Sequence, residues 1–440
     1  MMSMNKISAA FAAALMFFAS PVCASVIDID EAVRLTLENN ADLRSLRQEI
    51  VKAYAFKVQS DAAYLPSLNA ELSADRQRAS QTSDGSERSS SRSATATLEQ
   101  VIYSGGKNSA LRAQAPQMKN IADAAARDGE NSAAGEVYGR FYNVMLKKKE
   151  IEAEEAAVAV SEHNLLEVRK MAELGLANRL EIIRAEQQLA SDTADLVTAR
   201  GEHETAIISL LNYMAMEPDP KCEVVGELYE PEITGDREKS LALAEASRAD
   251  LLELKEELNY QRNQIRIEKS AMRPTVTAGL SSGWENPYNG DDRSETDWRA
   301  ELSISVPIFD RNVTRSAVIS ALAVLEQDRI ALEQKEIDIK SDVETAWTEI
   351  ETSLRSLRAS EKALDLAKES LRLAQVGFRE GVTPQLDLLE AQSTLTESQH
   401  EYNSALYDTL IAVVALKVTE GTIVEWHGRP VHINGDKRNE

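Results

Sequence analysis

The sequence predicts a mainly helical fold with a smaller β component, assembled twice along a chain of 440 residues. Three observations predict it: an internal duplication, four segments in which polar and apolar residues alternate, and two very long helical stretches. The clearest sign of duplication is the match of residues 175–185 (GLANRLEIIRA) with residues 381–391 (GVTPQLDLLEA), since 381 − 175 and 391 − 185 both give 206. A repeat of about two hundred residues is far too long for a solenoid. We therefore expect the function to lie in what the two halves enclose.

The duplication continues on the N-terminal side of this match. Residues 98–103 align with 304–309 at the same offset of 206, and Pro66 aligns with Pro274 at an offset of 274 − 66 = 208. Each repeat is expected to run helix, two strands, very long helix, glycine-containing break and helix. The predicted segments are a signal peptide over 1–24, a first repeat over 25–216, an insert over 217–238, a second repeat over 239–418 and a polar tail over 419–440.

The first residues predict export from the cytoplasm. Lys6 gives a positive start, residues 7–18 are mostly apolar, and residues 22–24 form a small-residue cleavage site before Ser25. A membrane anchor is disfavoured because roughly 12 to 15 apolar residues are too few to span a bilayer. A lipid-bearing Cys23 is a second alternative, although Val22 stands where a small residue is expected.

The chain is acidic. Its formal net charge of −23 becomes −24 when the signal peptide, whose one charged residue is Lys6, is removed. This charge argues against nucleic acid or an anionic lipid surface as a partner. Most acidic residues are interspersed with Lys and Arg, which is the usual pattern of solvated helix faces.

Four segments of about ten residues show the alternation of a strand with one apolar and one polar face. The first follows Pro66, and polar loops around residues 80–93 and 289–292 separate the members of each pair. The apolar face comprises Leu68, Ala70, Leu72, Ala74, Ala94, Ala96, Leu98, Val276, Ala278, Leu280, Ala300, Leu302, Ile304 and Val306.

About ten alternating residues is the length that a tilted strand needs to cross a bilayer. A soluble, half-buried hairpin is the alternative, because the signal of each segment is weak. Export, the absence of charge on the apolar faces and aromatic residues at the strand ends favour the membrane. These aromatic residues are Tyr64, Tyr103, Trp284, Tyr288, Trp298 and Phe309. Since open strand edges are not tolerated in lipid, at least two copies must contribute strands to one wall.

The stretches 107–174 and 313–380 are rich in Ala, Glu, Lys, Leu and Arg, and are expected to be single helices. Helices of about 65 residues reach about 100 Å at 1.5 Å per residue. A heptad spacing in the second stretch predicts a coiled-coil seam of Leu357, Leu364, Leu371 and Phe378. Residues 30–63 are expected to form another helix, ended by Pro66. Solvated helices stacked side by side are the simple interpretation, and a helical tube attached to a barrel is the specific one.

The chain resembles the TolC family of outer-membrane efflux proteins. The matching segments are 30–43 (DEAVRLTLENNADL), 65–68 (LPSL), 100–106 (QVIYSGG), 306–310 (VPIFD), 377–381 (GFREG) and 387–392 (DLLEAQ). Their order, spacing and duplication cover nearly the whole mature chain. The form Tyr103-Ser-Gly-Gly106 looks more like members that serve type I protein secretion.

The resemblance implies a homotrimer in which each chain gives four strands to a twelve-stranded barrel in the outer membrane and its helices to a periplasmic tunnel. It implies docking on a periplasmic adaptor protein and an inner-membrane transporter of the ABC or RND type. The expected function is a passive duct for efflux or type I secretion, with no cofactor. The chemistry of the cargo is left open.

The resemblance places the closed entrance and the adaptor-docking surface at the two glycine breaks. The docking turns are Gly175 with Leu176 and Gly381 with Val382. Thr383 is expected to be an N-cap with Pro384 at the first helical position, which puts Asp387 and Glu390 in the first turns.

Two interpretations of this acidic pair are open. Acids near a helix N-terminus favour the macrodipole, by roughly 0.3–1 kcal/mol each. Alternatively, Asp387 and Glu390 align with the acidic pair at the entrance of the family, where threefold symmetry gathers six carboxylates. Such a ring selects cations and offers hard oxygen ligands to a blocking metal ion; the sequence predicts no other metal site.

The family's entrance lock is altered in this sequence. An acid at the position of Glu181 pairs in better-known members with an Arg and a Tyr, but the aligned positions here are Thr383 and Phe378. Arg179 or Arg379 is available as a substitute nearby.

No enzyme site is predicted, because the five His residues lack metal-ligand spacing and no phosphate loop or Gly-x-Ser-x-Gly turn occurs. A soluble periplasmic coiled-coil adaptor or scaffold is the main alternative to a channel. The four amphipathic strands separate the two, since an adaptor needs no lipid-facing surface.

Overall fold

The computed structural model describes residues 26–79, 87–233, 235–287 and 295–426. The predicted signal peptide, Cys23, residues 80–86 of the first polar loop, all of the second, Tyr288 and the end of the tail lie outside these residues. Residues 87–93, expected to belong to the first polar loop, are instead the start of a strand. The chain divides into two compact units, one formed by Ser45–Arg127 and Ala249–Asp338, the other by the remainder. Each unit therefore contains parts of both repeats.

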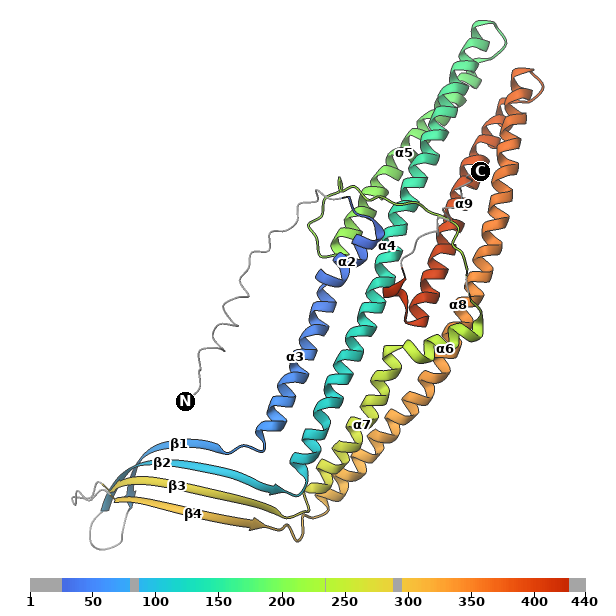
Figure 1. The fold of residues 1–440 in the computed structure, drawn as a ribbon. Helices are drawn as coiled ribbons and strands as arrows, with labels where there is room; N and C mark the ends of the chain where they lie inside the picture. Colours follow the sequence, from blue (N-terminus) through green and yellow to red (C-terminus); the bar gives the residue numbers. More distant parts are fainter. Residues whose placement is uncertain (1–25, 80–86, 234, 288–294, 427–440) are drawn as a thin grey trace, which may run out of the picture. The chain divides into compact units, whose positions relative to one another are not determined.

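The first of these units carries a four-stranded antiparallel sheet in the order β1-β2-β3-β4 (Figure 1). The strands are β1 (Ser67–Ala79), β2 (Glu87–Ser104), β3 (Thr275–Pro287) and β4 (Glu295–Ser305), so the four predicted strands are confirmed. β1 and β4 are the two edges of this sheet.

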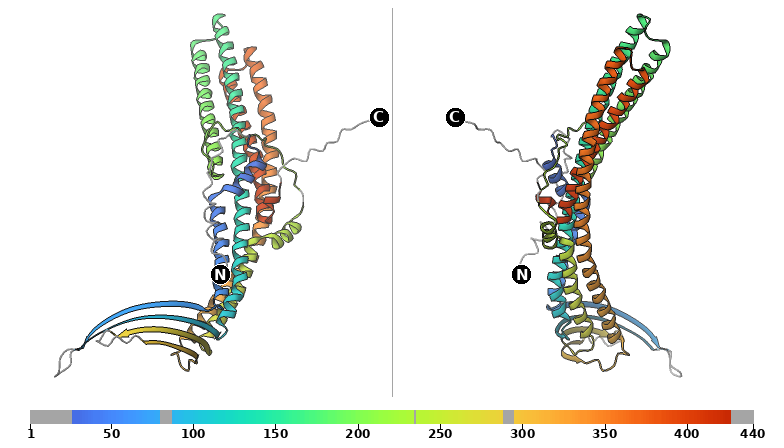
Figure 2. Two further views of the ribbon diagram at one scale, coloured as in Figure 1. Left: turned by 60° about the vertical axis from the view of Figure 1, so that its left-hand side comes forward. Right: turned by 90° about the vertical axis from the view of Figure 1, so that its right-hand side faces the viewer.

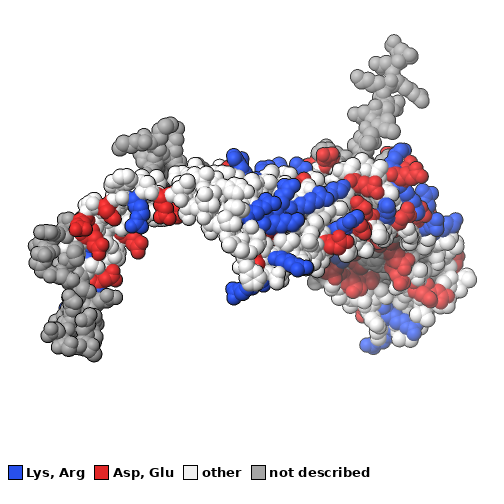
Figure 3. Space-filling view, turned by 90° about the horizontal axis from the view of Figure 1, so that it is seen from below, with Lys and Arg blue, Asp and Glu red and all other residues white. Residues whose placement is uncertain are grey.

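The strand register places the predicted apolar residues on one face. Leu68 pairs with Leu98, Leu98 with Leu280, and Leu280 with Ala300, which makes one apolar row across all four strands. Because side chains alternate between the two faces of a strand, every second residue along each strand lies on this same face. This face is bare in the single chain: Leu72 is 84% and Leu302 is 67% exposed. Figure 3 shows uncharged side chains along much of the sheet, with acidic side chains gathered at one end.

Four helical segments continue from the sheet in the same lateral order as the strands. They are α3 (Ala41–Ala62), the start of α4 (Lys107–Glu173), α7 (Ala249–Ser270) and the start of α8 (Val313–Arg379). Arg112 of α4 pairs with Asp61 of α3, Asn263 of α7 bonds Gln117 of α4, and Gln261 of α7 bonds the carbonyl of Ala321 in α8. α3 and α8 are thus the edges of the helical layer, as β1 and β4 are of the sheet.

The second unit contains two long helical hairpins, α4 with α5 (Arg179–Tyr213) and α8 with α9 (Gln385–Glu420), which Figures 1 and 2 show side by side. Short helices α2 (Ile29–Asn39), α6 (Arg237–Ser247) and η2 (Ile423–Glu425) accompany them. The core at their base is aromatic, with Tyr138, Phe141 and Tyr142 fully buried. Among the described helices, none has the length and apolarity needed to cross a membrane.

The expected single helix over residues 30–63 is wrong, because the chain breaks at Asn40. Asn40 has an extended ψ of 134°, and its side-chain oxygen accepts from the backbone N–H groups of Asp42 and Leu43. Its amide also donates to the carbonyl of Tyr213. Asn40 therefore caps α3 while holding it to α5, which an apolar stripe running through both helices does not reveal.

The two long helices are confirmed, and α4 continues through Pro116, which our expectation of an unbroken helix neglected. A proline removes one helical hydrogen bond and tends to kink a helix. The predicted heptad seam is also confirmed, since Leu357, Leu364, Leu371 and Phe378 are all buried.

The duplication is visible in the bounds of the elements. α3 and α7 are related by an offset of 208 at both ends, 249 − 41 and 270 − 62, and so are β1 and β3, 275 − 67 and 287 − 79. α4 and α8 are related by 206 at both ends, 313 − 107 and 379 − 173. The two repeats thus fold alike, element by element.

Candidate entrance at the hairpin tips

Each hairpin turns at a glycine in the left-handed conformation. Gly175 has φ 76° and Gly381 has φ 72°, which side chains other than glycine adopt at a cost. The next residue closes the turn: the N–H of Leu176 donates to the carbonyl of Met171, and that of Val382 to Gly377, both at 2.8 Å. Both turns are glycine C-caps of the Schellman type, which explains the repeated glycine in the sequence.

The first tip restarts with a capping box. The side chain of Asn178 accepts from the backbone of Leu180 and Glu181, and the Glu181 carboxylate accepts from the backbone N–H of Asn178 at 2.7 Å. Reciprocal capping satisfies donors that a helix start leaves open. The carboxylate of Glu181 is therefore engaged within its own turn.

The second tip is built differently, and the predicted N-cap at Thr383 is wrong. α9 begins at Gln385 with Pro384 as N-cap, and no side chain caps it. Thr383 instead packs over Gly377: a Cβ added to Gly377 would lie 2.1 Å from the Thr383 hydroxyl oxygen. Close approach of the turn to the helix explains the first glycine of the GFREG segment.

A hydrogen bond joins the two tips. The side-chain amide of Gln385 donates to the backbone carbonyl of Glu181 at 2.7 Å. Gln385 is buried, and its Oε1 has no hydrogen-bond partner among the described residues. A buried unpaired oxygen costs roughly 1–3 kcal/mol, so this contact between the tips carries an unfavourable term beside its hydrogen bond.

Below this bond the hairpins share an apolar seam. Phe378 is buried there with Leu165 and Val168 of α4 and Leu388 of α9. The phenyl ring of Phe378, which stands where the resemblance implies a tyrosine, therefore packs in this apolar cluster and has no hydroxyl to donate.

A buried polar cluster lies among the same helices. Asp192 of α5 accepts hydrogen bonds from Ser161 of α4, from Gln188 at 2.8 Å and from Gln392 of α9 at 3.1 Å. Asn164 of α4 donates to Oε1 of Gln392 at 2.8 Å. All but Gln188 are buried. The cluster ties the first hairpin to the second through a carboxylate whose partners are neutral.

The remaining predicted tip residues lie at the surface. Asp387 and Glu390 are exposed on α9, with Asp387 in its first turn, and neither makes an ion pair within the described residues. Arg179 and Arg379 are also exposed, and Arg379 donates to the carbonyl of Gln375. Neither arginine forms an ion pair with Glu181 within the described tips.

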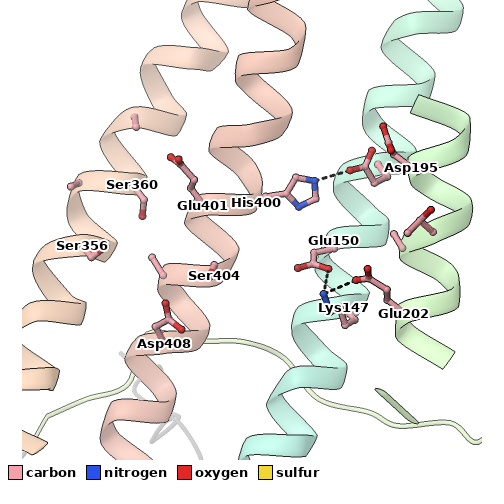
Figure 4. A pocket seen from close by; sticks show the side chains of 16 residues that line it. Lys147, Glu150, Asp195, Glu202, Ser356, Ser360, His400, Glu401, Ser404 and Asp408 are labelled. Carbon is pink, nitrogen blue, oxygen red and sulfur yellow. Dashed lines mark hydrogen bonds and ion pairs between the residues drawn. The ribbon is translucent and has the colours of Figure 1, made fainter. Parts of the chain in front are cut away.

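A groove of about 940 Å³ lies farther along the hairpins, between α4, α5, α8 and α9 (Figure 4). His400 meets Glu154 at 2.7 Å across it, and Lys147 pairs with Glu150 and Glu202. Burial alone would lower the pKa of Lys147, but these hydrogen bonds raise it overall. Burial also raises the pKa of the Asp408 carboxyl. Acids outnumber bases on the groove wall, which makes it electronegative.

No group of three or more potential metal ligands occurs among the described residues. Sequence reasoning missed Gln385, Gln392 and Asp192, which make polar contacts between the hairpins near the tips. One signal was available in the sequence. Gln385 and Gln392 fall on the apolar stripe of α9 that contains Leu388 and Ala391, where a buried residue is expected.

The fold matches solved outer-membrane proteins along its length. One is VceC from Vibrio cholerae, at 17% identity and a TM-score of 0.74, with 89% of this chain and 96% of that chain covered. Sequence relatives include the cobalt-zinc-cadmium resistance protein CzcC of Cupriavidus metallidurans, 23% identical over 75% of this chain and 77% of its own. The alkaline protease secretion protein AprF of Pseudomonas aeruginosa is 25% identical over 42% of this chain and 39% of its own.

These similarities show that the chain has the fold of solved outer-membrane proteins. The outer membrane efflux protein model matches residues 32–215 and 241–422, so the chain belongs to that family. The predicted family, outer-membrane location and role in efflux or secretion are confirmed. The alternative of a soluble adaptor is not favoured.

Proposed function

We propose that three copies of this chain form one passive duct through the outer membrane, each giving four strands to a twelve-stranded barrel. The observation that carries this proposal is the sheet itself. Its apolar face is continuous across four strands and bare, and β1 and β4 leave two open edges. Lipid covers such a face only when the edges are paired, because an unpaired backbone group in hydrocarbon costs several kcal/mol.

The hairpin tips are the proposed docking surface for a periplasmic adaptor. Leu176 is 74% and Val382 is 81% exposed beside the glycines Gly175 and Gly381. Apolar side chains exposed at these turns would be better accommodated against a protein partner than in contact with water. An inner-membrane transporter of the ABC or RND type supplies the energy, and the chain itself performs no reaction.

Cargo choice belongs to the transporter. The two relatives named for cobalt-zinc-cadmium resistance and for alkaline protease secretion are both similar in sequence to this chain, although metal ions and a protease are chemically unrelated cargoes. A wide, water-filled tube recognises little, so the same channel architecture suits both.

Asp387 and Glu390 are the proposed acidic ring of the entrance. Both side chains are exposed at the start of α9, next to the tip. Three copies bring six carboxylates around one axis, which favours cations and binds a multivalent cation more strongly than a monovalent one.

Single-channel recording in a planar bilayer tests the proposal. We expect discrete, cation-selective steps that a trivalent lanthanide ion suppresses from the tip side. The double variant Asp387→Asn with Glu390→Gln should keep the steps and lose the block, whereas Glu397→Gln, farther along α9, should keep both. Unchanged block in the double variant would refute the ring. A protein that never inserts would refute the duct.

A further inference from the structure

The two faces of the sheet differ in the sign of their charged residues. All Asp and Glu residues within the bounds of the four strands stand at odd-numbered positions, whereas every Arg except Arg299 stands at an even-numbered one. The register pairs even positions with even positions, as Ala74 with Arg92 and Arg92 with Asn286. Because side chains alternate along a strand, parity identifies the face. The face with the apolar rows therefore has no acidic position within these strand bounds, and the charge at its even positions is that of arginine.

The arginines lie beyond one end of the apolar rows. In β1, Leu72 is followed at even positions by Ala74 and Arg76, and Arg92 of β2 stands directly opposite Ala74. Arg76 and Arg92 are both exposed. They are diagonal neighbours across the two strands, and such neighbours lie roughly 7–8 Å apart. Two guanidinium groups at that separation can contact one multivalent anion together.

Tryptophan side chains mark the border between the apolar rows and the arginines. Trp284 of β3 lies in the row of Leu72, and Trp298 of β4 lies one row nearer the helices. Tryptophan gathers at the membrane interface on strands that face lipid. Each further row is two residues, or about 7 Å along a strand, and strands tilt by roughly 35–45°. Arg92 thus lies about 5 Å and Arg76 about 10 Å beyond this border, at the depth of lipid headgroups.

This end of the sheet is the one away from the helices. β1 starts at Ser67 just after α3, and β2 ends at Ser104 just before α4, whereas the arginines stand nearer the other ends of both strands. Figure 1 shows those other ends pointing away from the helices. The helices of these outer-membrane channels lie in the periplasm, so the arginine end reaches the outer leaflet. The lipid of that leaflet is lipopolysaccharide, whose lipid A anchor carries phosphate groups.

We propose that Arg76 and Arg92 bind the phosphate groups of lipopolysaccharide in the outer leaflet. This rests on the proposed lipid-facing sheet and goes beyond it by assigning that sheet a specific lipid contact. The planar guanidinium donates two parallel hydrogen bonds to a phosphate, and the pairing is charge-assisted. Asn286, which stands opposite Arg92, offers further donors through its side-chain amide.

The proposal is compatible with an acidic chain because the charges are separated by face. Glu71 and Asp75 of β1 stand at odd positions and so lie on the opposite side of the sheet from Arg76. Solvation alone does not account for arginine at these positions, since serine or glutamate would keep a strand end in water equally well. Carboxylates would also reach a lipid phosphate only through a bridging metal ion, whereas arginine binds it directly.

Lipid binding by the purified full-length chain in detergent tests the proposal. The probe is lipid A with two phosphate groups, titrated in the presence of a metal chelator, and native mass spectrometry counts the lipid bound to each protein oligomer. Each arginine beside an anionic lipid surface contributes about fivefold in affinity. The variant Arg76→Gln with Arg92→Gln should therefore bind lipid A roughly 25-fold more weakly.

Matched variants separate the arginine site from a general loss of charge. Arg92→Gln should weaken binding by about fivefold, whereas Arg299→Gln removes the same charge from the other face and should leave the affinity unchanged. Ala74→Glu keeps both arginines but sets a carboxylate opposite Arg92, so it should compete with the phosphate and weaken binding. Ala74→Gln, of similar size and neutral, should bind like the native chain.

The source of the phosphate is examined in the same titration. Dephosphorylated lipid A should bind as weakly as the double variant does, and inorganic phosphate should displace lipid A only at far higher concentration. Displacement at equal concentration would show a simple anion site and overturn the lipid assignment. An oligomer that binds lipid A equally with and without Arg76 and Arg92, or only when divalent metal is present, overturns the arginine site and leaves the duct intact. A chain that stays monomeric and never inserts overturns the proposed duct as well.

Discussion

The side-chain amide of Gln385 donates to the backbone carbonyl of Glu181 at 2.7 Å and so connects the two hairpin tips. The resemblance led us to expect that the family's acid, arginine and tyrosine lock is altered here, because Thr383 and Phe378 stand at the aligned positions. A neutral bond to a backbone atom does not depend on ionisation. It is also weaker than a charge-assisted one, which is roughly twice as strong as a neutral hydrogen bond. The contact between the hairpins near the tips therefore depends strongly on the buried apolar cluster of Leu165, Val168, Phe378 and Leu388 beside this bond.

Gln385→Glu should loosen the tips. It replaces a donor with a buried carboxylate that faces the carbonyl oxygen of Glu181, and leaving a buried polar group unpaired costs roughly 1–3 kcal/mol. We expect larger mean single-channel conductance in a planar bilayer. Gln385→Leu removes both the donor and the unpaired Oε1, so its conductance should change less. Equal conductance in the two variants would contradict the role assigned to this bond.

Asp192→Ala should destabilise the hairpin pair. The substitution removes the carboxylate that accepts hydrogen bonds from Ser161, Gln188 and Gln392. Since hydrogen bonds to a charged group contribute about 1.5–3 kcal/mol each and losses are not additive, we expect a loss of at least about 2 kcal/mol. Thermal unfolding in detergent measures it. Asp195→Ala, three residues along the same helix and exposed, is the control, and a comparable shift there would show that the buried cluster is not responsible.

Much of the fold was predictable because it follows short-range periodicity. Alternation located the four strands, and the heptad from Leu357 to Phe378 located the seam between helices. The break at Asn40 and the start of α9 at Gln385 were missed, because each depends on a contact or backbone angle that composition does not encode.

The candidate site was predicted less completely than the fold. The two turns were predictable from Gly175 and Gly381, because glycine readily adopts the positive φ that these turns require. The residues that join the hairpins were not, since Gln392 and Asp192 lie 200 residues apart and meet only after the two repeats pack together. A glutamine on the apolar stripe of α9 indicates burial, but it does not identify the partner residue on another helix.

Gly377→Ala should displace the second tip. The added Cβ would lie 2.1 Å from the hydroxyl oxygen and 3.0 Å from Cβ of Thr383, so the turn must move. Overpacking of this kind costs typically about 1–3 kcal/mol. Gly201→Ala in α5 meets no atom within 4 Å and should instead stabilise its helix by roughly 0.5–1 kcal/mol. The two variants are compared by thermal unfolding and by adaptor binding of the full-length chain. Equal stability and equal binding would show that Thr383 can move aside without cost.

Leu302→Arg should impair insertion of the sheet. Leu302 lies on the apolar face of β4, opposite Ala278 of β3, and is 67% exposed in the single chain. An arginine on a lipid-facing strand costs roughly 2–4 kcal/mol near the bilayer midplane and far less near the interfaces. The neighbouring Ser303 points to the other face of the same strand, so Ser303→Arg should insert nearly as well as the native chain. The yield of heat-resistant oligomer in the outer-membrane fraction measures both variants. If Ser303→Arg fails while Leu302→Arg inserts, the two faces of the sheet are assigned in reverse, and the charged row of Glu99, Glu301 and Arg299 would then have to face lipid. That outcome is unfavourable on both counts, because it would place three ionisable side chains against lipid and the apolar row against water.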